Sequence, residues 1–244
     1  MNLILACQIA GVYDVNRNIT LDHDDYSKVT AWADSLKNHK IKGILFHNNF
    51  SENTVTEYQD DFLEFVKVDH LTSFNPNVFR YFVYKSYIYN HINEIKNVFL
   101  TDVSDVIVVN NPFTDPYFIN HPDAIFCGDE NELLSNTWMK NHSTHLRNHI
   151  DDFSTIESKF QNASLLNCGI IGGNIEIMRA FLDNICEIHF HYNQNNKTAF
   201  TGDMGAFNYV IRKYFNEKIL HGAPINTVFK AYEDQRIDCW FRHK

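Results

Sequence analysis

Residues 97–113 read NVFLTDVSDVIVVNNPF, and this stretch decides the fold. An apolar run leads directly into Asp102 and Asp105, and a second apolar run follows and stops before Pro112. Short runs of apolar, β-branched residues are typical of buried strands. Two carboxylates at the end of a buried strand cost free energy unless a cation compensates them, and a divalent metal is the obvious candidate. On these residues alone, an acidic turn that binds nothing is an equally good interpretation.

The composition indicates one large globular domain. The chain has 244 residues, of which 44% are hydrophobic, and this is enough to bury an ample core. Its formal net charge of −9 argues against a nucleic-acid partner, because a phosphate backbone would repel it. No apolar run has the length needed to cross a bilayer, so we expect no transmembrane segment.

The cysteines indicate a reducing compartment. There are five, they are scattered along the chain, and no two form a Cys-x-x-Cys pair. This usage predicts free thiols and a cytoplasmic location. The first residues lack a basic region before a strand-length apolar run, so we expect no signal peptide.

Strand-like and helix-like patterns alternate along the chain. Strand patterns occupy residues 3–7, 43–46, 64–69, 98–100, 106–109, 125–130, 165–174 and 219–220. Helical patterns begin after Asp24 or Asp25, at Asn75-Pro76, at residue 175 and near Asp203. The alternation predicts an α/β fold with a central, mainly parallel sheet flanked by helices. In open sheets of this kind, ligands bind at the carboxyl ends of the strands.

Two features outside residues 97–113 also suggest a ligand, and a third residue, Asp203, has a simpler explanation. Arg80 falls in the first turn of a helix, where a cation opposes the helix dipole, so we expect it to pair with an anion or a carboxylate. Glycines interrupt the strand pattern of residues 165–174, which usually marks a bulge or a close approach by a ligand. Asp203 precedes a helical pattern and could simply be its N-cap.

A histidine-rich stretch has two interpretations. His142, His145 and His149 share one face of an ideal helix, which is a spacing that a zinc site could use. Exposed histidines on a polar helix explain the pattern equally well. We favour a mobile segment over a cleft.

Four motifs, taken in order, resemble those of GT-A-type glycosyltransferases that use nucleotide-sugars. They are LTDVSDV at 100–106 followed by NPF at 111–113, LNCGIIGG at 166–173, GDMGAFN at 202–208 and HGAP at 221–224. The nearest resemblance is to small glycosyltransferase domains of bacteria and of large algal DNA viruses. It implies a single GT-A-like, Rossmann-like domain over residues 1–229, with residues 230–244 as a C-terminal tail or lid.

The resemblance also implies roles for individual residues. Asp102 and Asp105 take the place of the family's Asp-x-Asp motif, which holds Mn²⁺ (or Mg²⁺), although here the acids are three positions apart. Asp105 resembles the last aspartate of that motif, and His221 resembles a further metal ligand. Asp203 resembles the catalytic acid that faces the sugar and the acceptor. The residues that would bind the nucleotide-sugar are Ala6, Cys7, Arg17, Arg80, Asp102, Asn167, Gly169, Gly172 and Gly173.

The expected function is metal-dependent transfer of a sugar from a nucleoside-diphosphate sugar, such as a UDP-sugar, to a hydroxyl of a glycan or another acceptor. A divalent metal would stabilise the negative charge of the leaving diphosphate. Asp203 would deprotonate the acceptor if configuration inverts, or orient the donor sugar if it is retained. Two alternatives stay open: a nucleotidyltransferase that makes an activated sugar, and a non-catalytic domain that binds nucleotide-sugars.

Overall fold

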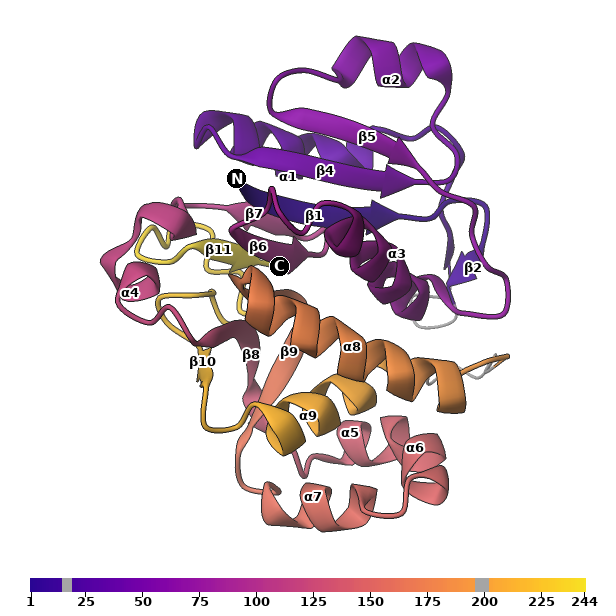
Figure 1. Cartoon of the computed structure of the whole chain (residues 1–244), viewed down its shortest axis with the longest axis vertical. Coiled ribbons are helices and arrows are strands. Elements are labelled where there is room, and N and C mark those ends of the chain that lie inside the picture. Colours follow the sequence, from indigo (N-terminus) through magenta and orange to yellow (C-terminus); the bar gives the residue numbers. More distant parts are fainter. Residues whose placement is uncertain (15–18, 196–201) are drawn as a thin grey trace.

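A seven-stranded sheet forms the centre of the computed structural model, which describes residues 1–14, 19–195 and 202–244 (Figure 1). In spatial order its strands are β10 (Ile219–His221), β8 (Ile125–Leu133), β9 (Ser164–Asn174), β6 (Asn97–Thr101), β1 (Asn2–Gln8), β4 (Lys42–His47) and β5 (Leu63–Lys67). All neighbouring pairs are parallel except those of β9, which runs antiparallel to β6 and to β8. The predicted α/β class with a mainly parallel sheet is confirmed.

Two short ribbons lie beside this sheet. One pairs β7 (Val106–Val108) antiparallel with β11 (Phe241–His243). The other pairs β2 (Tyr13–Asp14) with β3 (Ile19–Thr20). The first ribbon joins the chain after β6 to the last residues of the sequence.

Helices cover both faces of the sheet. They are α1 (Ser27–Asn38), α2 (Glu52–Tyr58), α3 (Pro76–Asn90), α4 (Pro116–Ile119), α5 (Thr137–His142), α6 (Thr144–His149), α7 (Phe153–Lys159), α8 (Ile175–Tyr192) and α9 (Asp203–Tyr214), with a 3₁₀ turn at Pro112–Thr114. The predicted helix start at Asn75-Pro76 is confirmed, since the side chain of Asn75 accepts a hydrogen bond from the backbone N–H of Asn77. Asn174 caps α8 in the same way, by accepting from the N–H of Ile177.

The alternation of side chains along the central strands divides the core into two clusters. In β1, Leu3 and Leu5 pack with residues of α3, α8 and α9 on one face of the sheet. Ile4 and Ala6 point to the other face and pack with residues of α1 and of β7. Successive strand residues face opposite sides of the sheet, so a strand with no polar residue in its middle contributes apolar side chains to both clusters.

Residues near the C-terminus pack into the hydrophobic core, within the segment 230–244 that the sequence suggests is a tail or lid. Cys239, Trp240 and Phe241 have relative exposures of 0%, 1% and 0%. The indole N–H of Trp240 donates to Asp115 at 2.9 Å. The physical reason is that β7 presents an open edge, and β11 supplies the backbone groups that this edge needs.

Two further findings concern membrane spans and cysteines. None of the helices in residues 1–14, 19–195 and 202–244 is both long enough and apolar enough to cross a membrane. The thiols of all five cysteines are free.

Truncating Trp240 tests whether the C-terminal residues are core. We expect Trp240→Ala to lower the free energy of unfolding by about 4 kcal/mol, because it leaves a cavity and removes the indole donor to Asp115 Oδ2. Ile237→Ala is the matched control: Ile237 lies in the same segment but is 76% exposed, and its change should stay within about 0.5 kcal/mol. Urea denaturation followed by circular dichroism measures both. Equal stability of the two variants would show that this segment is a dispensable tail.

A buried histidine predicts an acid-sensitive fold. His189 is 0% exposed, its Nδ1 accepts from Asn193 at 2.8 Å, and its ring stacks on Tyr81. Burial lowers the pKa of His189 to about 3, so the imidazole is neutral in the folded protein. The unfolded chain, with an ordinary histidine pKa, binds a proton more readily, so stability is present above that ordinary value and is lost as the pH falls.

The measurement is the pH dependence of unfolding in the wild type and in His189→Gln. Between about pH 7 and about pH 5 the wild type should lose roughly 2 kcal/mol more than the variant. Parallel curves for the two proteins would contradict a neutral, buried His189.

Candidate functional site

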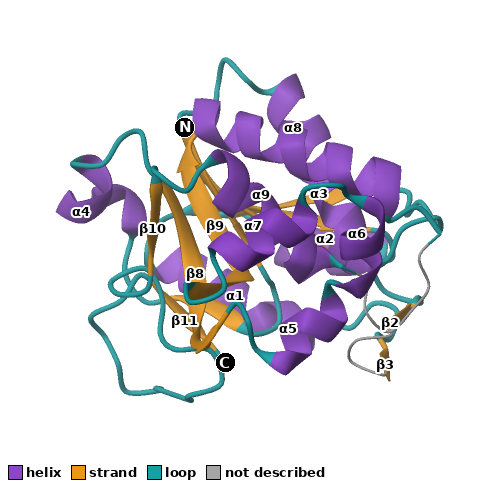
Figure 2. Ribbon diagram, turned by 90° about the horizontal axis from the view of Figure 1, so that it is seen from below, coloured by secondary structure: helices purple, strands orange, loops and turns teal. Residues whose placement is uncertain are grey.

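A cavity of about 500 Å³ opens where β6 ends and the chain turns toward β7. Its wall includes Asp102 and Asp105 from this turn, Arg80 from α3, Asp203 from α9 and His243 from β11. In Figure 2, α5 and the C-terminus lie at the same end of the molecule, and residues of both line the cavity. The position agrees with the general rule that ligands bind at the carboxyl ends of parallel strands.

Two carboxylates and one imidazole converge on the cavity wall. Asp102, Asp105 and His243 each offer one ligand atom, and these atoms lie within 4.8 Å of one another. The distance from Asp105 Oδ2 to His243 Nε2 is 4.0 Å. Two carboxylates and a neutral imidazole are a donor set that suits Mn²⁺, with Mg²⁺ as a substitute. These three residues therefore fit a divalent metal by the chemistry of their atoms.

The backbone explains how acids three positions apart reach one point. Asp102 still follows the ladder of β6, since its N–H donates to the carbonyl of Gly169 in β9 at 2.8 Å. Asp105 directly precedes β7, and its carbonyl accepts from the N–H of Lys244 at 2.9 Å. The bend between the two strands thus brings acids three positions apart to one point.

Gly169 leaves the space in which the cluster forms. A Cβ at this position would lie 2.6 Å from His243 Cε1 and 3.0 Å from Asp102 Oδ2. The N–H of Gly169 is held by Asn167 Oδ1 at 2.7 Å, and Asn167 in turn donates to Glu130 at 2.7 Å. Glycine is therefore required for close approach, as the glycines of this strand predict.

Arg80 pairs with a carboxylate, as its position in the first turns of α3 predicts. Its guanidinium donates to Asp102 Oδ1, and at 3.3 Å to both the carbonyl and the thiol of Cys168. Burial disfavours the charged guanidinium, but the charge of Asp102 and smaller contributions from Tyr81, Cys168 and Tyr84 together outweigh this and raise the pKa of Arg80. Because one oxygen of Asp102 is engaged, its second oxygen is the one that faces Gly169 and the cluster.

Asp203 lies beside the cluster and is paired with a histidine. It is the first residue of α9 rather than the N-cap, which is Gly202. His142 Nε2 lies 3.0 Å from Asp203 Oδ1, and the two residues are 1% and 6% exposed. Burial raises the pKa of Asp203, but the hydrogen bond from His142 and the charges of His142 and Arg80 dominate and hold it well below its usual range. Asp203 is therefore an anion.

A second, smaller cavity of about 60 Å³ adjoins the first. The two share Asn77, Arg80 and Asp102, and the second extends to Cys7 and Gln8 at the end of β1. Cys7 therefore lines the smaller cavity, and burial raises its pKa to about 12, so it is a neutral thiol.

Two other residues of the first strand and the loop after it, Ala6 and Arg17, are also predicted to bind the nucleotide-sugar. Ala6 points away from both cavities into the core beside α1. Arg17 lies outside the described residues.

The structure does not bring His221 to the carboxylates. It lies in β10, and its Nδ1 is 2.8 Å from Asp129 Oδ2. Two strands separate β10 from β6, which at ordinary strand spacing is roughly 14 Å. The imidazole beside Asp105 belongs to His243 instead, because β11 pairs with β7.

Gly172 and Gly173 lie away from the cavity, at the other end of β9. Gly172 faces the ring of Phe99, and a Cβ at Gly173 would lie 2.9 Å from the carbonyl of Ala124. Their role in this structure is to let the strand pack closely in the core. Only Asn167 and Gly169 of this strand's predicted residues reach the site.

The three histidines do not share a helical face. The helix breaks after His142, and a second helix begins at Thr144. His142 points to Asp203, whereas His145 contacts the carbonyl of Tyr192 and His149 contacts that of His145. The zinc interpretation therefore has no geometric support among these residues, and the segment does border the cavity, through Trp138 and His142.

Sequence reasoning missed the roles of His142 and His243. His142 is visible only as one member of a histidine-rich stretch, and nothing in the spacing distinguishes it from its neighbours. His243 follows the apolar run CWF at 239–241, which is a strand signal that the expectation of a tail obscured.

Comparison with known proteins adds no relative. No family model matches this chain, and a search of curated proteins finds no match to it.

Filling the space at Gly169 tests the cluster as a metal site. Gly169→Ala should weaken Mn²⁺ binding by about tenfold or more, because the added methyl group displaces His243 and Asp102. Gly128→Ala is the matched control, since a Cβ there meets nothing closer than 3.6 Å. Titration of the free Mn²⁺ signal by electron paramagnetic resonance measures both affinities. Equal binding by the two variants would place the metal elsewhere.

Proposed function

We propose that this protein is a metal-dependent glycosyltransferase that moves a sugar from a nucleoside-diphosphate sugar, such as a UDP-sugar, to a hydroxyl group. The observation that carries the proposal is the convergence of Asp102, Asp105 and His243 on a cavity of about 500 Å³ at the end of β6. Arg80 and the buried anion of Asp203 complete the wall. The resemblance in sequence motifs points to the same chemistry.

The donor diphosphate fits beside the cluster. Asp105, His243 and the second oxygen of Asp102 would hold a divalent metal, which when bound supplies positive charge to the leaving diphosphate. Arg80 adds a permanent positive charge at the boundary of the two cavities, and Lys230 and Lys244 line the larger one. These cations favour an anionic ligand locally in a chain whose net charge is −9.

We place the nucleoside at the smaller cavity, whose volume of about 60 Å³ can enclose only part of it. Its walls at the end of β1 combine Ile9 and Val12 with the polar side chain of Gln8 and with Lys28. Arg80 then stands between the nucleoside and the sugar, where the diphosphate would lie. The neutral thiol of Cys7 supplies packing surface rather than charge. Free thiols throughout the chain agree with a cytoplasmic enzyme.

Asp203 suits an electrostatic role better than proton abstraction. A carboxylate whose pKa is held low by His142 and Arg80 is a weak base, so it gains little by taking a proton from a hydroxyl. The same fixed negative charge can orient donor hydroxyls and stabilise positive charge at the anomeric carbon. This argument favours retention of configuration over inversion.

The two alternative functions predict different products. A nucleotidyltransferase needs a glycine-rich phosphate-binding loop after the first strand, and the described residues of that loop contain one glycine, Gly11. It would release pyrophosphate from a nucleoside triphosphate. A non-catalytic domain would bind a nucleoside diphosphate without turning over any nucleotide-sugar.

A donor-hydrolysis assay tests the proposal. With Mn²⁺ and a panel of UDP- and GDP-sugars, the wild type should release nucleoside diphosphate, and chelation with EDTA should stop the release. Asp105→Asn should lower the rate about a hundredfold or more, because it removes a charged metal ligand and leaves the side-chain volume unchanged. The exposed Asp61→Asn is the control for the loss of one negative charge and should hydrolyse at the wild-type rate.

Three results would contradict the proposal. They are hydrolysis that survives both EDTA and Asp105→Asn, release of pyrophosphate in place of nucleoside diphosphate, and calorimetric binding of nucleoside diphosphate with no turnover of any sugar in the panel.

A further inference from the structure

Trp138 differs from the other two tryptophans of the chain. Trp32 and Trp240 are buried, and their indole N–H groups donate to Thr101 and Asp115, both at 2.9 Å. Trp138 is 50% exposed and lies on the wall of the large cavity. The core therefore does not require this indole, and its apolar surface faces the space in which a substrate would bind.

The neighbours of Trp138 hold it in place. Met139, the next residue of α5, is buried, and the side chain of Asn136 caps the helix by accepting from the N–H of Met139 at 2.8 Å. One face of the indole stacks on His142, with ring centroids 4.7 Å apart and planes 24° apart. His142 in turn forms a hydrogen bond with Asp203. The exposed indole therefore contacts His142, and His142 contacts Asp203.

A second exposed aromatic side chain lies on the wall of the same cavity. Tyr232 is 67% exposed and lines the cavity together with Phe229 and Lys230. Both Lys230 and Tyr232 have positive φ angles, of 61° and 51°, in the left-handed region that favours glycine. Non-glycine residues persist in that region only where the surrounding structure fixes them, and they concentrate at ligand sites.

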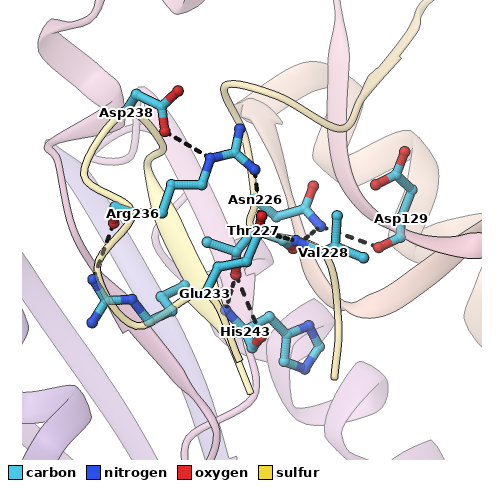
Figure 3. Close-up of polar contacts among 9 residues, drawn as sticks. Asp129, Asn226, Thr227, Val228, Glu233, Arg236, Asp238 and His243 are labelled. Atoms are coloured by element: carbon cyan, nitrogen blue, oxygen red, sulfur yellow. Dashed lines mark hydrogen bonds and ion pairs between the residues drawn. The ribbon is translucent and has the colours of Figure 1, made fainter. Parts of the chain in front are cut away.

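Glu233 fixes this loop. Its carboxylate accepts from the N–H of Val228 at 2.9 Å and from Arg236 at 3.2 Å, as Figure 3 shows. Arg236 is itself held by Asp238 at 2.7 Å. Residues 228–236 thus form a loop that is held by side-chain hydrogen bonds and that places Lys230 and Tyr232 on the cavity wall.

Polar groups line the cavity together with the two aromatic residues. Asn167 and Glu130 lie on its wall, with Asn167 Nδ2 donating to Glu130 Oε1 at 2.7 Å. Burial raises the pKa of Glu130, although the hydrogen bond from Asn167 opposes the shift. Amide and carboxyl groups of this kind bind hydroxyls, whereas aromatic rings bind apolar faces.

We infer that this part of the cavity is the acceptor subsite and that it takes a carbohydrate ring. A pyranose has an apolar face of C–H groups and an edge of hydroxyls, and these two surfaces match exposed rings and nearby polar side chains. The acceptor class rests on the proposed function, but the binding of a saccharide to these residues does not. Trp138 and Tyr232 act here as binding residues, and Lys230 supplies a further hydrogen-bond donor.

The test is saccharide binding by the full chain without donor. Saturation-transfer NMR with methyl α- and β-glycosides of glucose, galactose and mannose, and with the disaccharides maltose, cellobiose and lactose, yields a Kd for each. We expect at least one to bind, with Trp138→Ala and Tyr232→Ala each raising its Kd about tenfold through loss of an aromatic contact. Trp138→Phe keeps a ring on His142 and should stay within about threefold.

Phe190→Ala is the matched control for the loss of an exposed aromatic side chain. Phe190 is 54% exposed, lies on α8 and is not part of the cavity wall. The variant should bind the saccharide with the wild-type Kd.

Two outcomes overturn the inference: no saccharide of the panel binds, or Trp138→Ala and Tyr232→Ala bind as the wild type does. Adding peptides that contain serine or tyrosine to the same measurement identifies a polypeptide acceptor, which would also overturn it. Failure here is distinct from failure of the proposed function. Donor hydrolysis without saccharide binding removes only the acceptor assignment, and saccharide binding without hydrolysis removes only the transferase.

Discussion

The pairing of β11 with β7 joins the core to the site. Phe241 and His243 are neighbours on the same short strand, but they point to different surroundings. Phe241 is buried against Phe99 in the cluster beside α1, while His243 reaches Asp105 and is covered by Phe229. Backbone hydrogen bonds hold β11 at both ends: the carbonyl of Trp240 accepts from the N–H groups of residues 109 and 110, and the N–H of Lys244 donates to the carbonyl of Asp105. A change that loosens the hydrophobic packing of β11 therefore also moves His243.

Charge is shared across the site rather than paired residue by residue. Arg80 bonds Asp102 directly, and its positive charge also favours ionised Asp203. His142 contributes from the other side of Asp203. The result is a cavity wall in which Arg80 and the buried carboxylates are already held by one another, so little reorganisation would be needed when a charged ligand binds. An Arg80 variant would accordingly disturb both carboxylates, and its effect would not identify either one alone.

Local pattern was sufficient to predict the strands of the central sheet, the main helices and the carboxylates, since each depends on residues close in sequence. The start of α3 at Asn75-Pro76 and the two apolar runs around Asp102 and Asp105 are examples. His221 and His243 show where local pattern stops. Each is an imidazole next to a strand, and only the order of the strands decides which one meets Asp105. That order depends on β9 entering between β6 and β8 in the antiparallel sense, which no single stretch of sequence reveals.

The glycines of β9 also show that local sequence does not determine what surrounds a residue. Gly169 and Gly172 belong to one motif and read alike, yet one opens space for the cluster and the other accommodates the ring of Phe99. The pairing of Gly172 with Phe99 in the ladder separates the two roles. The sequence predicts close approach at both positions but not what approaches.

The late position of β11 in the chain has a consequence for synthesis. A ribosome produces β7 long before β11, so the edge of β7 has no partner from the described chain until residue 243 has left the exit tunnel. During that interval the nascent protein exposes Phe99 and Val108 to solvent or to a chaperone, and Asp102 and Asp105 lack the imidazole of His243. Assembly of the cluster of Asp102, Asp105 and His243 and completion of the core thus become one late event in the life of each molecule, and partial chains released early would lack both and be prone to aggregate.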